Sequence, residues 1–269
     1  MVPTVERVRH AISFRLLEVV DREDLTPHLR RITLAGEDLA DFASAAPDDH
    51  IKLFFAAEPD GPPIVPTLGA RGVEFPPDQP RPASRDYTPR RFDADAGRLV
   101  VDFVLHGDGP AASWAAAAGP GSQIVQAGPR GSRVFSADFD WYLLAGDETA
   151  LPAIARRLEE LPPDARVIVV AEVADAAEEL DLQSPAAVEL TWLHRGDREP
   201  GTTSLLEDAV RELALPPGDG FAWAATEADT ARSLRRHLRE ERGLPREWTR
   251  ITGYWRRGVA DHHDQPDEA

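Results

Sequence analysis

The chain has 269 residues, and its 47 Asp and Glu outnumber its 30 Lys and Arg, which gives a formal net charge of -17 at pH 7. This charge argues against a nucleic-acid-binding protein, because such binding depends on neutralising phosphates with Lys and Arg. The hydrophobic content of 42%, with six Trp and ten Phe, is enough for packed cores and excludes a disordered chain.

The chain contains no Cys, so disulfides, a thiol nucleophile and a thiolate-ligated iron-sulfur cluster are excluded. Any electron chemistry must therefore use a bound organic cofactor or a metal held by other ligands. No N-terminal stretch combines a basic region with an apolar core, and no run approaches the ~20 apolar residues of a membrane span. We expect a cytoplasmic protein without stable membrane insertion.

The first half of the chain predicts short strands separated by Pro, Gly and Asp, as in an antiparallel β-barrel or sandwich. Residues 58–84 are rich in Pro and Gly without periodicity and predict a long irregular excursion. The turn at residues 128–132 is expected to close the barrel. The predicted strands cover residues 11–20, 29–34, 51–56, 99–105 and 122–126.

Residues 84–91 place an aromatic ring, a hydroxyl and three guanidinium groups in eight residues. On an extended segment Arg85 and Tyr87 point to one face and Asp86 and Thr88 to the other. A flat ligand could stack on Tyr87 while Arg85 and Arg90 bind its phosphates. A solvated basic turn explains the same residues, and this stretch alone leaves both interpretations open.

The predicted strand at residues 99–105 leads through Gly107 and Gly109 into an Ala-rich helix with Pro110 in its first turn. A helix N-terminus behind glycines presents free backbone N–H groups, which favour a pyrophosphate. A purely structural connection is the alternative.

From Trp141 onward, strands alternate with helices, which predicts a parallel sheet covered on both faces. The helix near residues 203–213 begins with Ser204 and Glu207 at the spacing of a capping box. Ligands of such sheets bind at the carboxyl ends of the strands, which here carry Asp147, Glu148, Thr149, Glu172, His194, Arg195, Thr226 and Glu227. We predict a β-domain over 1–136, an α/β domain over 137–260 and a disordered acidic tail over 261–269.

Four motifs occur in order along the chain. They are Arg-Asp-Tyr-Thr-Pro-Arg at 85–90, Phe-Val-Leu-His-Gly-Asp-Gly-Pro-Ala at 103–111, Gly-Pro-Arg-Gly-Ser at 128–132, and Gly-Tyr-Trp-Arg-Arg-Gly at 253–258. Together they resemble the siderophore-interacting protein family, the flavin-dependent ferric-siderophore reductases of the ferredoxin-reductase-like superfamily. The resemblance covers nearly the whole chain, and it implies an FAD-binding antiparallel β-barrel followed by an NAD(P)H-binding-like α/β domain.

The resemblance implies roles for the residues of the first domain. Tyr87 would stack on the isoalloxazine, Thr88 would contact its polar edge, and Arg85 would hold a phosphate, with Arg90 as a further candidate. Trp114 is expected to pack the short helix onto the barrel. The ribityl chain and pyrophosphate would be lined by Val104, Leu105, His106, Gly109, Pro110 and Ala111.

For the second domain the resemblance implies NAD(P)H at the strand ends, with Asp147, Glu148, Thr226 and Glu227 on the nicotinamide side and Thr149 near the flavin or the nicotinamide. The family often has Ala-Gly-Glu where this chain has Ala-Thr-Glu at 225–227, so the Cβ of Thr226 would narrow the approach of a nucleotide. Glu172 would repel a 2′-phosphate, which weakly favours NADH over NADPH.

A ferric tricatecholate is anionic, so its site should offer cations. Lys52 is the only lysine of the chain and is our first candidate; its neighbour His50, Arg256 and Arg257 follow, although a solvated surface would also explain these side chains.

No residue is predicted to bind a structural metal. We expect a monomer. The alternatives are another NAD(P)H- or ferredoxin-fed flavin oxidoreductase, with ferredoxin as a partner, and a siderophore-binding protein without catalysis.

Overall fold

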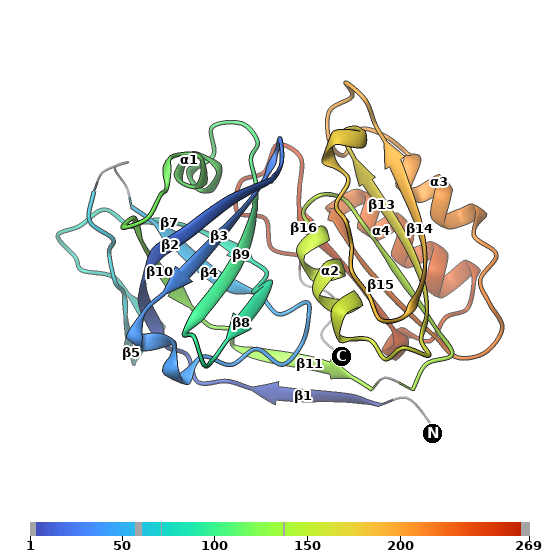
Figure 1. Cartoon of the computed structure of the whole chain (residues 1–269), viewed down its shortest axis with the longest axis horizontal. Helices are drawn as coiled ribbons and strands as arrows, with labels where there is room; N and C mark the ends of the chain where they lie inside the picture. Colours follow the sequence, from blue (N-terminus) through green and yellow to red (C-terminus); the bar gives the residue numbers. More distant parts are fainter. Residues whose placement is uncertain (1–3, 57–60, 71, 137, 265–269) are drawn as a thin grey trace. The chain divides into compact units, whose positions relative to one another are not determined.

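The computed structural model describes residues 4–56, 61–70, 72–136 and 138–264. It divides into two compact units (Figure 1). The β unit comprises Glu6–Val134, and the α/β unit comprises Met1–Val5 and Phe135–Ala269. Each unit has its own hydrophobic core.

The β unit is built on an antiparallel sheet with the strand order β7-β4-β10-β2-β3-β9-β8. Its side chains alternate between core and surface, as in β2, where Leu17 and Val19 are buried and Leu16 and Glu18 are exposed. The strands are β2 (Phe14–Thr26), β3 (Leu29–Ala35), β4 (Ile51–Phe55), β7 (Ala83–Tyr87), β8 (Arg91–Asp93), β9 (Arg98–Val104) and β10 (Gln123–Ala127), and a 3-10 helix covers Glu37–Asp41.

The sheet curls so that its edge strand β7 meets β9, where the ring of Tyr87 packs on that of Phe103 with centroids 4.4 Å apart. The predicted barrel is therefore a curled antiparallel sheet. The expectation that the turn at residues 128–132 closes it was wrong. The last residues of that segment already belong to β11 (Gly131–Phe135), which pairs with β1 (Val5–Arg9) in a separate ribbon. The predicted irregular excursion contains a hairpin of β5 (Thr67–Gly69) and β6 (Gly72–Glu74).

Helix α1 (Pro110–Ala117) covers one end of the curled sheet (Figure 1). Trp114 holds it there, since its ring lies against Phe55 at 5.9 Å and Phe103 at 5.6 Å between centroids. This packing confirms the structural role predicted for Trp114. Two strand arginines bind the free carbonyls at the helix C-terminus: Arg30 donates to Ala115 and Ala116, and Arg22 donates to Ala118.

The α/β unit contains a parallel sheet with the strand order β14-β13-β12-β15-β16. One core lies between this sheet and α2, and the other between the sheet and the pair α3 and α4 (Figure 1). The strands are β12 (Trp141–Gly146), β13 (Arg166–Val173), β14 (Ala187–His194), β15 (Gly220–Glu227) and β16 (Thr249–Trp255). The helices are α2 (Leu151–Glu160), α3 (Leu205–Glu212) and α4 (Ala228–Arg236), with a π-helical turn at His237–Glu241 and 3-10 turns at Ala176–Glu178 and Arg246–Trp248.

The predicted capping box at α3 does not form. The Ser204 hydroxyl donates to Asp208 instead of accepting a backbone N–H. The start of α3 is instead tied to the sheet by Thr203, whose hydroxyl donates to the carboxylate of Glu172 at the end of β13, at 2.9 Å.

Of the predicted acidic tail, residues 261–264 are described. The Asp264 carboxylate accepts hydrogen bonds from Arg235 and from the backbone N–H of Gly253, both at 2.9 Å, so this segment makes specific contacts with α4 and β16. Residues 265–269 lie outside the described residues. Among the described helices, none has the length and apolar character needed to cross a membrane.

Candidate functional sites in the two units

The predicted flavin motif begins on β7, whose register against β4 decides the direction of each side chain. Tyr87 lies opposite Ile51 and Arg85 opposite Leu53. Because Ile51 and Leu53 are fully buried in the core of the β unit, Arg85 and Tyr87 belong to the core side of this ladder. Both are half-buried, and burial raises the pKa of Tyr87 above its usual value. The predicted pairing of Arg85 and Tyr87 on one face is confirmed.

The next two candidates, Thr88 and Arg90, are buried at 7% exposure each. The guanidinium of Arg90 lies 4.0 Å from Asp102, a carboxylate that also binds Arg31 through two hydrogen bonds of 2.7 and 2.8 Å. Arg90 therefore lies in a charge cluster of the β unit, and a phosphate would have to compete with Asp102 for it.

The substrate candidate Lys52 lies opposite Asp86 across the same ladder, and its Nζ is 2.7 Å from the Asp86 carboxylate. Asp86 and Tyr87 are consecutive on β7, so Lys52 and Tyr87 point to opposite faces. The positive charge of Lys52 is shared with Asp86. His50, just before β4, is exposed.

The predicted pyrophosphate turn runs from the end of β9 to the start of α1. Leu105 is held by a backbone bond to His28, His106 is exposed, and Gly107 adopts a φ of +53° that favours glycine. Gly109 precedes Pro110 at the helix start, and no side chain caps this N-terminus within the described part of the chain. Arginines bind the carbonyls at the other end of α1, and Ala111 begins the buried face of the helix, so α1 is held in place. Its N-terminus, which carries the positive end of the helix dipole, is suited to a pyrophosphate.

In the α/β unit, the carboxyl ends of the strands form a buried polar network around Asp147, which is 6% exposed. One carboxylate oxygen accepts from the backbone N–H and the hydroxyl of Thr149 at 3.0 and 2.5 Å, and the other accepts from the Thr226 hydroxyl and the Trp255 indole N–H, both at 2.9 Å. The network joins the ends of β12, β15 and β16.

This network occupies the point where the order of the strands reverses, between β12 and β15. There the two strands approach so closely that a Cβ at Gly146 would collide with Ala150 and with the carbonyl of Ala225. In open α/β sheets this crevice is where nucleotides bind. The predicted nicotinamide-side residues Asp147 and Thr226 thus meet there, and Thr149 turns its hydroxyl toward Asp147.

The remaining acids at this edge are also paired. Glu148 forms an ion pair with Arg195, and burial together with Asp147 raises the pKa of Glu148. Glu172 accepts a hydrogen bond of 2.9 Å from Thr203, and burial raises its pKa as well. Glu172, which is predicted to repel a 2′-phosphate, is thus buried and bound within the unit.

Glu227 caps α4 with one carboxylate oxygen, which accepts from the N–H groups of Asp229 and Thr230. Its other oxygen accepts from the N–H of Arg257 at 3.3 Å. This bond fixes the start of the turn after β16, where Arg256 and Arg257 are exposed. Glu227 therefore acts on the position of two predicted substrate cations.

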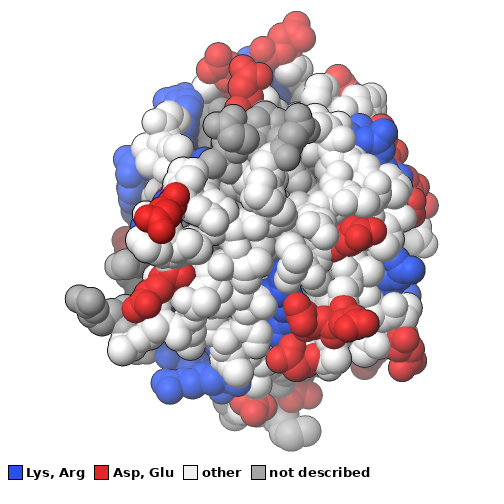
Figure 2. Space-filling view, turned by 90° about the vertical axis from the view of Figure 1, so that its left-hand side faces the viewer, with Lys and Arg blue, Asp and Glu red and all other residues white. Residues whose placement is uncertain are grey.

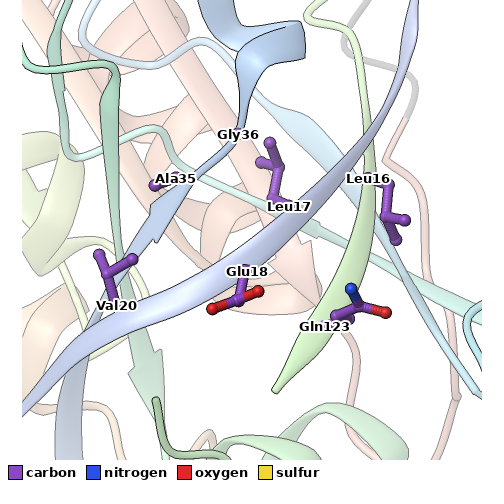
Figure 3. A pocket seen from close by; sticks show the side chains of 7 residues that line it. All are labelled: Leu16, Leu17, Glu18, Val20, Ala35, Gly36 and Gln123. Atoms are coloured by element: carbon purple, nitrogen blue, oxygen red, sulfur yellow. The ribbon is translucent and has the colours of Figure 1, made fainter. Parts of the chain in front are cut away.

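On the face shown in Figure 2, uncharged side chains predominate. A hollow of about 340 Å³ lies beside β2 and is lined by Leu16, Leu17, Glu18, Val20, Ala35, Gly36 and Gln123 (Figure 3). No predicted site residue lines this hollow among the described residues, and its lining offers one carboxylate and no cation.

Sequence reasoning did not predict the role of Trp255 at Asp147 or the pairing of Arg195 with Glu148. Trp255 is 108 positions from Asp147. The available signal was the parallel sheet itself, because residues that end parallel strands meet at one edge whatever their separation in sequence.

A curled antiparallel sheet followed by an α/β unit with a parallel five-stranded sheet is the two-domain architecture of the ferredoxin-reductase-like fold. Comparison with known proteins then identifies the family. A model described as "Siderophore-interacting FAD-binding domain" matches residues 18–133, and one described as "Siderophore-interacting protein" matches residues 139–258. The chain belongs to the siderophore-interacting protein family.

Similar proteins cover nearly the whole chain. The NADPH-dependent ferric-chelate reductase of Escherichia coli K12 is 35% identical over 253 residues, which is 93% of this chain and 96% of that one. The ferric vibriobactin reductase ViuB of Vibrio cholerae is 34% identical over 247 residues, or 91% and 90%. The crystal structure of a siderophore utilization protein from T. fusca is similar at 45% identity and a TM-score of 0.89, and the match covers 97% and 98% of the two chains.

Proposed function

We propose that the chain is an FAD-dependent ferric-siderophore reductase that takes hydride from NAD(P)H and delivers electrons to the iron of a ferric siderophore. The observation that carries the proposal is the arrangement on β7 and α1, with Arg85 and Tyr87 on one side of a ladder and an uncapped helix N-terminus in the same unit. The match of this unit to a siderophore-interacting FAD-binding domain and the names of two relatives support it.

The residues of the β unit would hold the cofactor. Tyr87 offers a ring for stacking, Arg85 a bidentate partner for a phosphate, and Thr88 a hydroxyl beside them. The turn from Val104 through Ala111 offers backbone N–H groups to the pyrophosphate. Bound FAD supplies the chemistry, because it accepts two electrons as hydride and passes them on singly.

Ferric iron in the siderophore is the substrate. Hard oxygen ligands hold the ferric ion much more tightly than the ferrous ion, so its reduction loosens the complex and releases iron. The cations proposed to attract an anionic ferric complex are Lys52, Arg256 and Arg257, with His50 as an exposed neighbour. Release in the cytoplasm, a monomeric state and ferredoxin as an alternative donor stay predictions.

Absorption spectroscopy tests the proposal. We expect the purified protein to be yellow, to bleach when NADH or NADPH is added without oxygen, and to recover its colour when a ferric siderophore follows. A chelator of ferrous iron should report the released metal. Protein that stays colourless in excess FAD, or that is not reoxidised by any ferric siderophore, would overturn the proposal.

A further inference from the structure

Arg195 and Glu148 form an ion pair across the end of β13, which is the strand end that nucleotide-binding sheets use to recognise the coenzyme. Arg195 directly follows β14, and Glu148 lies two residues after β12. Strand β13 lies between these two in the sheet (Figure 1). The backbone N–H of Arg195 donates to the carbonyl of Val173 at the end of β13, at 3.0 Å. The pair therefore crosses the carboxyl end of β13.

This pair is enclosed. The side chains of Arg195 and Glu148 are 8% and 12% exposed, and Glu172, the neighbouring acid on β13, is 6% exposed. Attraction by Arg195 is among the influences on the pKa values of both Glu148 and Glu172. The Arg195 guanidinium thus pairs with a half-buried carboxylate near a second, buried one.

The end of the second strand is where a doubly wound sheet distinguishes the two nicotinamide coenzymes. An acid there accepts the ribose 2′-hydroxyl of NAD, whereas a nearby arginine accommodates the 2′-phosphate of NADP. In this chain β13 is the second strand of the sheet, Glu172 is the acid, and Arg195 is the arginine. Glu148 adds a third element, because it already holds the guanidinium that a 2′-phosphate would need.

We propose that Glu148 withholds Arg195 from the 2′-phosphate of NADPH, so that the Glu148–Arg195 pair makes the chain prefer NADH. The inference rests on the proposed function, of which it specifies the coenzyme. It makes Glu148 a specificity-determining residue and Arg195 a latent phosphate ligand. A 2′-phosphate has to break a buried ion pair and approach Glu172, whereas a 2′-hydroxyl does neither.

Equilibrium binding of the oxidised coenzymes tests the inference without turnover. Calorimetric titration of the FAD-loaded full-length protein with NAD⁺ and NADP⁺ compares two ligands that differ only in the 2′-phosphate. We expect the parent to bind NAD⁺ more tightly. Glu148→Gln, which keeps the shape and removes the charge, should tighten NADP⁺ binding relative to NAD⁺ binding about tenfold, the effect of one hydrogen bond to a charged group.

Two further variants make the test specific. The double variant Glu148→Gln with Arg195→Gln should return NADP⁺ binding to the parental level, because the released guanidinium is then absent. Glu179→Gln is the matched control: Glu179 pairs with His194 at the end of β14 at 2.7 Å, but the two side chains are 34% and 42% exposed. This control should leave the ratio of the two affinities unchanged.

Several outcomes would overturn the inference. They are tighter binding of NADP⁺ than of NAD⁺ by the parent, an equal change for both coenzymes in Glu148→Gln, or a gain that persists in the double variant. Binding of neither coenzyme would overturn both the inference and the nicotinamide donor of the proposed function. Failure to take up FAD is visible as a colourless protein and contradicts the proposed function alone.

Discussion

Replacement of Asp147 by Ala tests whether the network at the switch point is a structural centre of the α/β unit. The carboxylate accepts four hydrogen bonds, at 2.5, 2.9, 2.9 and 3.0 Å. Thr149 and Trp255 are only partly buried and can turn to water, but the Thr226 hydroxyl, in a residue 3% exposed, cannot. An orphaned buried donor costs about 1–3 kcal/mol.

The magnitude follows from three contributions. The orphaned Thr226 hydroxyl costs about 2 kcal/mol, and the lost charged hydrogen bonds from Thr149 and Trp255 add about 1 kcal/mol net. Removal of a buried charge beside Glu148, whose pKa Asp147 raises, returns about 1 kcal/mol. We expect a net loss of about 2 kcal/mol, or about 6 °C in the melting temperature of the α/β unit.

Urea and thermal unfolding, followed by Trp fluorescence and calorimetry, measure this loss. Thr226→Val in the Asp147→Ala background should recover about 1 kcal/mol, because it removes the orphaned hydroxyl. Asp140→Ala is the matched control at the opposite end of β12, where the carboxylate is exposed and accepts from the N–H of Asp219 at 2.7 Å; its effect should stay near 0.5 kcal/mol. Equal losses for Asp147→Ala and Asp140→Ala, or strictly additive effects of Asp147→Ala and Thr226→Val, would refute the reasoning.

Three further predictions concern the β unit. Arg85→Ala should weaken FAD binding about 10- to 100-fold in a fluorescence titration, because it removes a charged phosphate ligand. Tyr87→Phe keeps the stacking ring, so its FAD affinity should stay within about threefold of the parent. An unchanged affinity in Arg85→Ala would contradict the assigned role. Lys52→Ala should raise the KM for an anionic ferric siderophore about threefold, and Asp86→Asn, which removes the ion-pair partner of Lys52, should lower this KM. The rate of flavin reduction by NADH should stay constant in both variants. If neither variant changes the KM, Lys52 and Asp86 form only a surface ion pair. Asp49→Asn should flatten the fall in stability above pH 3.8 that its buried carboxyl causes, measured as unfolding free energy against pH. An unchanged slope would remove Asp49 as the cause.

The sign of the Asp49 effect follows from its surroundings. Burial raises the pKa of Asp49 above its usual 3.8, in spite of hydrogen bonds from Ser44, Ser132 and the N–H of Ala46. Above pH 3.8 the folded protein then binds this proton more tightly than the unfolded chain does. Stability from this group therefore falls as the pH rises from 3.8 through the folded pKa, and a neutral side chain at this position removes the dependence.

Local patterns in the sequence were sufficient to predict most strands and helices. The alternation around Leu17 and Val19 predicts a half-buried strand, and the apolar run over 166–173 predicts a strand covered on both faces. The order of motifs also predicted which unit offers the flavin residues. These features depend on residues that are close to one another in the sequence, so a single sequence is enough to predict them.

The pairings could not be predicted in the same way, since they depend on register and strand order. Lys52 meets Asp86 only because β4 pairs with β7 at this offset. Trp255 meets Asp147 only because β16 and β12 end at the same edge of the sheet. The spacing of Ser204 and Glu207 indicated a capping box, but the Ser204 hydroxyl donates to Asp208 instead.

Pairing also decides which arginines of this Arg-rich chain are available to a ligand. Arg22 and Arg30 bind carbonyls of α1, Arg31 binds Asp102, and Arg90 lies against the same carboxylate. These side chains hold the β unit together, and diverting one to a phosphate would leave a buried carboxylate or carbonyl without its donor. Arg85 differs in its position, because it shares the core side of the β7–β4 ladder with Tyr87, the ring proposed to stack on the flavin. An arginine count would rank Arg85 and Arg90 equally as flavin ligands, whereas this position favours Arg85.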